Sequence, residues 1–330
     1  MRPPRLEASD AAADVAIHVH GLTKTYSGRP ALRGIDLEVR CGEIFALLGP
    51  NGAGKTTTVE ILEGYRRRDG GEVSVLGCDP GRHRSRLKAR VGIVLQSTGV
   101  EPYLTARETL TMYCGFYPHP RPVAEVIDLV GLTAKADQRV NGLSGGQQRR
   151  LDVAIALAGD PELLFLDEPT TGFDPAARHE AWEVVKNLAS LGKTVVLTTH
   201  YMDEAQYLAD RVAVVARGQV IAEGPPSTLG QRDLSHVRIR FRRPPDWALP
   251  AGWEPASDID GFVETVVERP EQLLHELTGW ALDHGVSLEG LEVTRPSLED
   301  VYLALTAGAP AQPDGAAPEA SGGGPSDGGR

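Results

Sequence analysis

The segment Gly49–Thr56 reads Gly-Pro-Asn-Gly-Ala-Gly-Lys-Thr and matches the pattern G-x-x-x-x-G-K-[ST] in full. It follows the apolar run Ile44–Leu48, which we expect to be a buried strand, and precedes Thr57–Leu62, which we expect to be a helix. Glycines let the backbone approach phosphate oxygens closely, and N–H groups at a helix N-terminus point towards negative charge. The segment therefore predicts a site for the phosphates of a nucleotide.

Two side chains of this loop have specific expected roles. Lys55 should reach the β- and γ-phosphates, and the hydroxyl of Thr56 should bind Mg²⁺. The chain contains no [Asn/Thr]-Lys-x-Asp sequence for recognising guanine, so we expect the nucleotide to be ATP. The expected contacts from this segment are Gly49, Pro50, Asn51, Gly52, Ala53, Gly54, Lys55, Thr56 and Thr57.

A second apolar run, Leu163–Leu166, ends in the acidic pair Asp167 and Glu168. Many strands end in acidic residues, so the pair alone indicates little. Beside a phosphate-binding loop, a carboxylate at a strand end commonly holds Mg²⁺, and we expect Asp167 to do so through water. Glu168 lies one position further on, where it can polarise the attacking water as a general base.

Between these two segments lies Leu143–Gln147, with the sequence Leu-Ser-Gly-Gly-Gln, followed by a helical stretch at Leu151–Ala158. A Ser and two glycines at a helix start can present backbone N–H groups to an anion. The same residues also fit a simple capped turn in which Ser144 is the N-cap. Taken alone, the segment favours the capped turn.

Together, these segments resemble the ATP-binding cassette (ABC) family, in which Leu143–Gln147 matches the signature motif. The other family motifs follow in the same order. Tyr26 matches the aromatic residue that stacks on adenine, and Gln96 matches the glutamine that links Mg²⁺ and water to the permease interface. Gly172–Asp174 matches the D-loop, where Phe replaces the usual Leu, and His200 matches the switch histidine that contacts the γ-phosphate.

The resemblance implies a composite site in which two cassettes face each other head to tail. ATP lies between the phosphate loop of one cassette and the signature of the other, so Ser144 and Gly146 would act on the partner's nucleotide. Because the chain carries one cassette, it must pair with a second copy or with a related ATPase. ATP closes this dimer and hydrolysis reopens it, and the cycle is coupled to a separate integral-membrane permease.

The family also implies the role of each matching residue. The implied catalytic residues are Glu168, His200 and Gln96. The implied metal site comprises Thr56, Gln96 and Asp167. The signature and the D-loop add Ser144, Gly145, Gly146, Gln147 and Asp174 to the nucleotide contacts, and Tyr26 contacts the adenine. Since each catalytic position matches the motif, we expect hydrolysis to be retained.

The end of the chain narrows the resemblance to one branch. Pro296–Thr306 resembles the ending of ATPase subunits of the daunorubicin/doxorubicin-resistance type of exporter, and His200–Ala205 is similar to the same branch. The alternative for the C-terminal match is a generic capped helix, because Ser297 and Asp300 fit a capping box. The resemblance implies an ATPase that powers efflux of a small molecule or drug.

Other ABC functions stay open as alternatives. An importer ATPase is one, although many importers carry a larger and different C-terminal regulatory domain. Soluble ABC proteins of translation usually have two cassettes and basic extensions, whereas this chain has one cassette and is acidic. Those of chromosome maintenance split the cassette with long heptad-patterned arms, and no sustained heptads lie between Gly49 and Glu168.

The elements that must position these residues predict an α/β fold. Residues 15–230 alternate apolar strands with amphipathic helices and short turns, and the resemblance implies a P-loop NTPase cassette with a mixed sheet and a helical subdomain at about 97–155. Residues 231–306 predict a small α+β domain with strands at His236–Phe241 and Gly261–Glu268 and a helix at Pro270–His284. The extension 1–14 and the tail 307–330 are expected to be disordered.

Composition excludes several other classes of protein. The formal net charge of −11 argues against a general nucleic-acid binder, because phosphate backbones are held by clustered Lys and Arg. Cys41, Cys78 and Cys114 form no CxxC pair, so we expect three small buried side chains in a reducing compartment. No run of about 18 apolar residues occurs. We therefore expect a cytoplasmic protein that reaches the inner face of the membrane through the permease.

Overall fold

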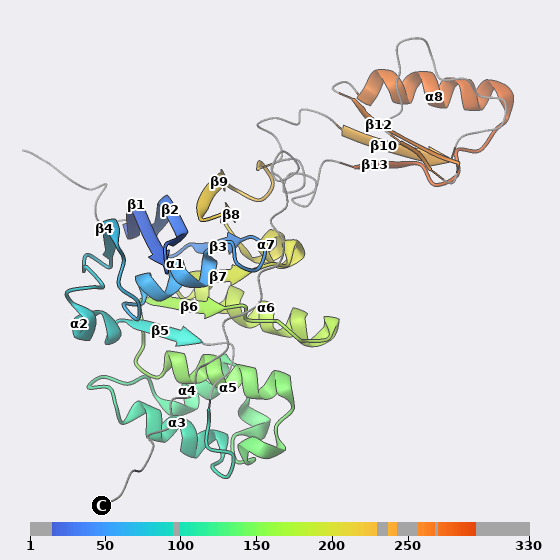
Figure 1. The fold of residues 1–330 in the computed structure, drawn as a ribbon. Coiled ribbons are helices and arrows are strands. Elements are labelled where there is room, and N and C mark those ends of the chain that lie inside the picture. The colour runs from blue at the N-terminus through green and yellow to red at the C-terminus, as the bar shows by residue number, and fades with distance from the viewer. Residues whose placement is uncertain are drawn as a thin grey trace, which may run out of the picture.

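The computed structural model describes residues 15–94, 99–229, 237–242, 257–259, 261–267 and 270–294. Four sequence predictions lie outside these residues: the extension 1–14, the position of Gln96, the C-terminal helix expected from Ser297, and the tail from residue 307. The described strands form three sheets of six, three and four strands, and helices pack against them (Figure 1).

The largest sheet contains six strands. In spatial order they are β5 (Val91–Val94), β6 (Leu163–Asp167), β7 (Thr194–Thr199), β3 (Ile44–Leu48), β8 (Arg211–Ala216) and β9 (Gln219–Gly224). Neighbouring strands pair in parallel except β8 and β9, so the sheet is mixed, as predicted. β6, β7 and β3 lie side by side, and their carboxyl ends therefore meet at one edge of the sheet, where open α/β sheets bind ligands.

Strand β3 is buried on both faces, as its uninterrupted apolar sequence predicts. Ile44, Ala46 and Leu48 belong to one hydrophobic core, which also contains residues of α6 (Pro175–Ser190) and α7 (Met202–Leu208). Phe45 and Leu47 belong to a second core on the other face. Successive side chains of β3 thus point into the two hydrophobic cores alternately, and the sheet lies between these cores.

The second core is completed by three elements from the N-terminal part of the chain. They are α1 (Lys55–Leu62), the short helix α2 (Arg84–Lys88), and an antiparallel sheet with the order β2 (Arg29–Arg40), β1 (Val15–Tyr26) and β4 (Gly70–Val75). In α2 only Leu87 is buried, so its basic residues lie on an exposed helix face. Helix α1 begins two residues before the predicted Thr57, because Gly54 takes the N-cap position.

A helical layer lies on the opposite side of the sheet (Figure 1, green). It contains α3 (Ala106–Cys114), α4 (Val123–Leu129), α5 (Gly145–Leu157) and 3₁₀ turns at Thr133–Lys135 and Val140–Gly142. A capping box between Thr105 and Glu108 starts α3. Helix α5 starts before the predicted Leu151, because Ser144 caps it.

The C-terminal residues form a smaller α+β unit. Its antiparallel sheet has the order β11 (Ser257–Ile259), β12 (Phe262–Val267), β10 (Val237–Arg242) and β13 (Glu292–Thr294). Helix α8 spans Pro270–His284, the range predicted from the sequence. Its Leu273 and Leu277 pack with Ile239 and Phe241 of the sheet in a separate hydrophobic core.

One expectation about the cysteines is wrong. Cys78 and Cys114 are buried, but Cys41 is exposed. It lies in the turn between β2 and β3, and connecting turns run over protein surfaces because their backbone polar groups need water. Among the helices of the described ranges, none is both long and apolar enough to span a bilayer.

Candidate nucleotide-binding and catalytic site

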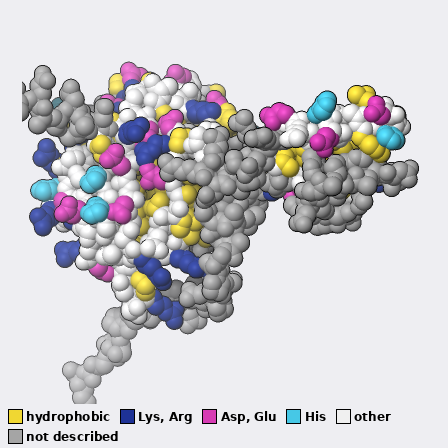
Figure 2. All heavy atoms as spheres, turned by 90° about the horizontal axis from the view of Figure 1, so that it is seen from above, with side chains coloured by type: hydrophobic (Ala, Val, Ile, Leu, Met, Phe, Trp, Pro, Cys, Tyr) yellow, Lys and Arg dark blue, Asp and Glu magenta, His cyan; other side chains and the backbone are white. Residues whose placement is uncertain are grey.

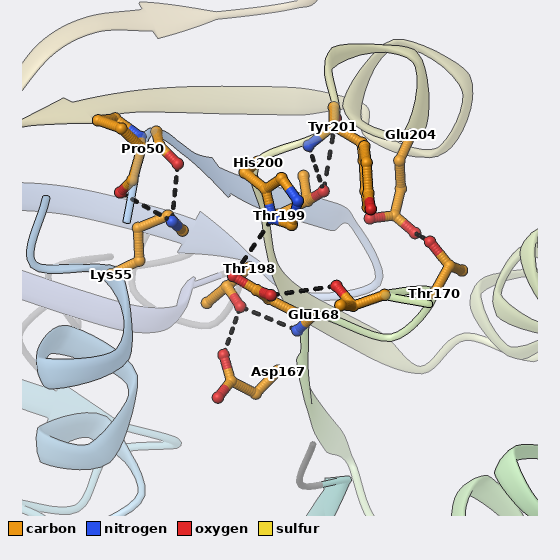
Figure 3. Close-up of polar contacts among 12 residues, drawn as sticks. Pro50, Lys55, Asp167, Glu168, Thr170, Thr198, Thr199, His200, Tyr201 and Glu204 are labelled. Atoms are coloured by element: carbon orange, nitrogen blue, oxygen red, sulfur yellow. Dashed lines mark hydrogen bonds and ion pairs between the residues drawn. The ribbon is translucent and has the colours of Figure 1, made fainter. Parts of the chain in front are cut away.

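Three segments that are distant in the sequence meet at the carboxyl ends of β3, β6 and β7 (Figure 3). β3 leads into the loop Gly49–Thr56, β6 ends at Asp167, and β7 ends directly before His200. The N–H of Gly49 donates to the carbonyl oxygen of Thr199 at 3.3 Å, which joins the loop to the end of β7. The strand order therefore brings together the predicted phosphate, metal and catalytic residues.

The backbone of the loop favours glycine at three positions, one of which is Gly52 with a φ of 80°. A Cβ atom on Gly49 would lie 2.2 Å from the carbonyl oxygen of Val215, and one on Gly54 would lie 2.7 Å from the side chain of Leu32. Gly54 also has a φ of 111°, which other residues rarely adopt. Helix α1 begins directly after it without a side-chain cap, so the first N–H groups of the helix are available to an anion.

The ammonium group of Lys55 lies inside this loop. The side chain is buried, and Nζ donates to the carbonyl oxygens of Gly49 at 2.7 Å and Pro50 at 3.1 Å. Burial lowers the pKa of Lys55, and the negative charges of Glu168 and Asp167 oppose that shift. An ammonium has three donors, so Lys55 can replace a carbonyl partner with a phosphate oxygen.

Asp167 is held by a hydroxyl group that the sequence analysis did not single out. Thr198, fully buried on β7, donates its hydroxyl to Oδ1 of Asp167 at 2.5 Å. The hydroxyl oxygen of Thr198 in turn accepts the backbone N–H of Glu168 at 3.0 Å. Asp167 and Thr198 are register partners in the parallel pair β6–β7, so the sheet itself sets this contact. In the sequence, this contact is indicated only by the polar Thr198, which follows the apolar run within the strand Thr194–Thr199.

Glu168 has a strained backbone, and its side chain contacts Thr171 and His200. Its φ is 45°, in the left-handed region, which costs a non-glycine residue about 1–3 kcal/mol. Oε2 accepts a hydrogen bond from the hydroxyl of Thr171 at 3.1 Å, and Nδ1 of His200 lies 3.4 Å from Oε1. The Glu168 and His200 side chains point towards one another in Figure 3. The carboxylate thus lies between Thr171, which directly precedes the D-loop, and His200, which directly follows β7.

A buried arginine, Arg149 on α5, contacts the backbone on both sides of Glu168. Its Nη2 donates to the carbonyl oxygen of Asp167 at 3.1 Å, and its Nε donates to that of Pro169 at 3.2 Å. Asp152, one helical turn further on, lies 3.7 Å from Nη1. Burial lowers the pKa of Arg149, while the charges of Asp152 and Asp167 oppose the shift. In the sequence, Arg149 belongs to a polar run, which gave no signal that it is buried.

The signature and D-loop residues have capping roles within the single chain. Ser144 and Gln147 form a capping box: the N–H of Gln147 donates to the Ser144 hydroxyl at 3.3 Å, and the N–H of Ser144 donates to the Gln147 side chain at 3.0 Å. Asp174 caps α6 by accepting the N–H of Ala177 at 2.9 Å. Ser144 and Gly145 are nevertheless exposed. Gly145 lines, together with Arg149 and Glu168, a cavity of about 610 Å³.

Tyr26 lies at the end of β1, where 36% of the residue is exposed. The guanidinium of Arg66 lies 5.1 Å from the centroid of its ring, and Nζ of Lys24 lies 5.5 Å from it. An exposed aromatic ring of this kind offers a stacking surface for a base.

The oxygen donors in the site fit a magnesium ion. Thr56 is exposed in the first turn of α1, and Asp167 ends the neighbouring strand β6. Mg²⁺ in nucleotide sites is usually bound through one or two protein oxygens, phosphate oxygens and water. A hydroxyl and a carboxylate are therefore a sufficient protein contribution. Gln96, the third residue expected to contact the metal, lies outside the described residues.

Glu63, directly after α1, is a buried carboxyl group near the site. Burial raises its pKa to about 8, and the negative charges of Asp167 and Glu60 add to this effect. Its ordinary value is 4.5, so between pH 4.5 and about 8 the folded chain binds a proton that the unfolded chain has lost. The free energy of unfolding must therefore fall as the pH rises through this window.

Replacing Glu63 with Gln is expected to remove this pH dependence. The variant should gain stability over the wild type by roughly 1.4 kcal/mol per pH unit between pH 5 and pH 8, because the amide carries no charge to desolvate. Urea unfolding of both proteins across this range measures the difference. A difference that stays constant with pH would show that Glu63 titrates normally in the folded chain.

Comparison with known proteins agrees with this geometry. Residues 32–171 match the family described as ABC transporter, and residues 237–297 match the ABC transporter domain-containing protein-like C-terminal domain. The chain is 41% identical over 304 residues to Nod factor export ATP-binding protein I of Rhizobium meliloti, with 88% of each chain covered. It is 39% identical over 305 residues to daunorubicin resistance ATP-binding protein DrrA2 of Streptomyces coeruleorubidus, with 88% of this chain and 95% of the relative covered.

Solved structures share the fold. One is the dimeric structure of an ATP-binding cassette in a post-hydrolysis state with ADP and Pi, with a TM-score of 0.57 and 28% identity, covering 63% of this chain and 98% of that chain. Another is CbiO1 of Clostridium perfringens, with a TM-score of 0.59 and 27% identity, covering 67% and 92%. The similarity to the relatives extends over most of both chains. The chain therefore belongs to the family of ATP-hydrolysing ABC transporter subunits.

Proposed function

We propose that this chain powers the efflux of a small molecule or drug through a separate membrane permease. The observation that carries the ATPase part is the meeting of Lys55, Asp167 and Glu168 at the carboxyl ends of β3 and β6, the two strands that flank β7. Support for export comes from the relatives, whose names describe Nod factor export and daunorubicin resistance. An importer ATPase is the alternative that the transport experiment below would reveal.

In this proposal, the residues of Gly49–Thr57 bind the phosphates of ATP and Tyr26 stacks on its adenine. Lys55 turns from the carbonyl oxygens of Gly49 and Pro50 to the β- and γ-phosphate oxygens. Thr56, Asp167 and Gln96 would hold Mg²⁺, which would neutralise charge on these oxygens. Thr198 keeps the Asp167 carboxylate turned to the site, because it donates to one of its oxygens.

Glu168 then acts as the general base. It accepts a proton from water as the water oxygen bonds to the γ-phosphorus, and the bond from that phosphorus to the ADP oxygen breaks. Inorganic phosphate leaves and carries the proton away. His200 would contact the γ-phosphate. Its Nδ1 lies 3.4 Å from the Glu168 carboxylate, which places the ring beside the proposed general base.

We further propose that the complete site needs two chains. Ser144, Gly145, Gly146 and Gln147 would contact the nucleotide of the partner, and Asp174 would lie at the same interface. Support comes from the exposure of Ser144 and Gly145 in the single chain and from the dimeric state of the similar solved cassette. The partner is a second copy or a related ATPase.

The same proposal covers the organisation and location of the chain. We assign 15–230 to the nucleotide-binding domain, with the helical subdomain at about 97–155, and 231–306 to a small C-terminal domain. The chain would lie at the inner face of the cell membrane, bound to the permease. Figure 2 shows Lys and Arg mixed with Asp and Glu over part of one face, and the formal net charge of −11 supports a function without nucleic acid.

Transport in inside-out vesicles tests the proposal. The tagged full-length chain would first be purified to identify its membrane partner. Both proteins would then be produced together in cells, and inside-out vesicles from these cells would be placed in a medium that contains daunorubicin as the probe. ATP-dependent accumulation inside the vesicles is expected, and it should vanish when Glu168 is replaced by Gln. ATP-dependent release from preloaded vesicles would instead indicate import, and the absence of any co-purifying membrane protein would contradict a transport role.

A further inference from the structure

Arg149 connects the helix that follows the signature, α5, to the backbone around the proposed general base, Glu168. It lies on α5, the helix that begins at the signature, and it donates one hydrogen bond to the last residue of β6 and one to the loop that follows. Both acceptors are backbone carbonyl oxygens, and they belong to Asp167 and Pro169, the residues on either side of Glu168. The carboxylate of Asp152 lies 3.7 Å from Nη1 of Arg149. Two donors of the guanidinium, Nε and Nη2, are thus directed at the backbone around Glu168.

This arrangement explains how the backbone of Glu168 keeps a disfavoured conformation. A φ of 45° requires outside support in a residue other than glycine. The N–H of Glu168 is held on one side by Thr198 of β7, and the two flanking carbonyl groups are held on the other side by Arg149 of α5. A guanidinium presents its donors in a rigid planar fork, which suits two acceptors at a fixed separation.

We propose that Arg149 is a positioning residue that sets the orientation of Glu168 for attack by water. This proposal rests on the proposed role of Glu168. It adds that the orientation of Glu168 is imposed from α5, the helix whose N-terminus would contact the nucleotide of the partner. Arg149 acts on the hydrolysis step through the backbone. It takes no part in holding ATP or in forming the dimer.

Arg149→Lys tests the proposal, because it keeps the positive charge beside Asp152 but cannot reproduce the fork. The turnover number of the full-length chain should fall about 10- to 100-fold, as expected when a catalytic group is misplaced by about 1 Å. The KM for ATP should stay within twofold. The matched control is Arg150→Lys, the next residue on α5, whose guanidinium pairs with the exposed Glu180 and should tolerate the change. Equal turnover in Arg149→Lys and wild type would overturn the proposal.

A second measurement separates positioning from a general loss of structure. In a Glu168→Gln background, the added Arg149→Lys should leave the ATP-dependent dimer on size-exclusion chromatography unchanged. The reason is that Arg149 acts only on hydrolysis, and Glu168→Gln has already slowed that step. Loss of that dimer only in the double variant would show that Arg149 serves the signature helix and would contradict the proposal. If Glu168→Gln alone keeps normal turnover, the proposed function itself fails, whatever Arg149 does.

Should Arg149→Lys be unstable, the pair Arg149→Gln with Asp152→Asn replaces it. Both charges of the Arg149–Asp152 pair are then removed together, so neither member is left charged without the other. Thermal unfolding verifies that the fold persists. The same 10- to 100-fold loss in turnover at constant KM is expected. Wild-type turnover in this folded double variant would equally refute a role for the two hydrogen bonds.

Discussion

Replacing Glu168 with Gln is expected to lower ATP turnover about 100-fold or more, because a general base contributes roughly 10²- to 10⁴-fold to a reaction rate. The amide has the shape of the carboxylate and can still accept the hydrogen bond from Thr171. It cannot take a proton from water at neutral pH. Binding of ATP should be unaffected, since the phosphates are held by the loop Gly49–Thr56 on another strand.

Slow hydrolysis has a structural consequence if ATP closes a dimer and hydrolysis reopens it. The Glu168→Gln chain should accumulate as an ATP-bound dimer, measured by size-exclusion chromatography with light scattering. Glu162→Gln provides a matched control, because it makes the same change just before the same strand, where Glu162 pairs with Arg90 at the surface. Normal turnover in Glu168→Gln would remove Glu168 from its role.

The sequence was most informative where one local pattern determines one element. The apolar run Ile44–Leu48 became β3, and the amphipathic stretch Pro270–His284 became α8, both with the predicted bounds. Hydrophobic periodicity and capping residues act over a few positions, so they can be recognised without knowledge of the fold. The family resemblance, the ATPase assignment and the mixed α/β cassette are confirmed by the comparisons and the sheet order.

The residues that the sequence analysis missed depend on contacts between distant segments. Thr198 lies opposite Asp167 only because β6 and β7 pair in parallel with that register. Arg149 is buried only because α5 packs beside the end of β6, and in the sequence it stands in the polar run Gln148–Arg150. Cys41 was expected to be buried from residue type alone, but its position in a turn exposes it. Residue type and spacing do not contain these relationships.

Replacing Lys55 with Ala is expected to weaken ATP binding at least about 100-fold, since hydrogen bonds to charged groups contribute up to about 3 kcal/mol and the lost charge adds to this. The ammonium is the buried cation of the loop, and it already lies at hydrogen-bonding distance from the carbonyl oxygens of Gly49 and Pro50. Its loss leaves the loop with backbone N–H groups but no cationic side chain for the β- and γ-phosphates. Titration with a fluorescent ATP analogue measures the change.

The same substitution also removes the hydrogen bonds from Lys55 to the loop carbonyl oxygens, so a disordered loop must be distinguished from a lost phosphate contact. AMP provides this control, because it lacks the β- and γ-phosphates that Lys55 contacts. The wild type and Lys55→Ala should therefore bind AMP with equal affinity, although weakly. A parallel loss of AMP binding would indicate that Lys55 acts by keeping the loop folded. Unchanged affinity for ATP would refute the assignment of the site, since the binding of the phosphates would then not depend on the buried ammonium group.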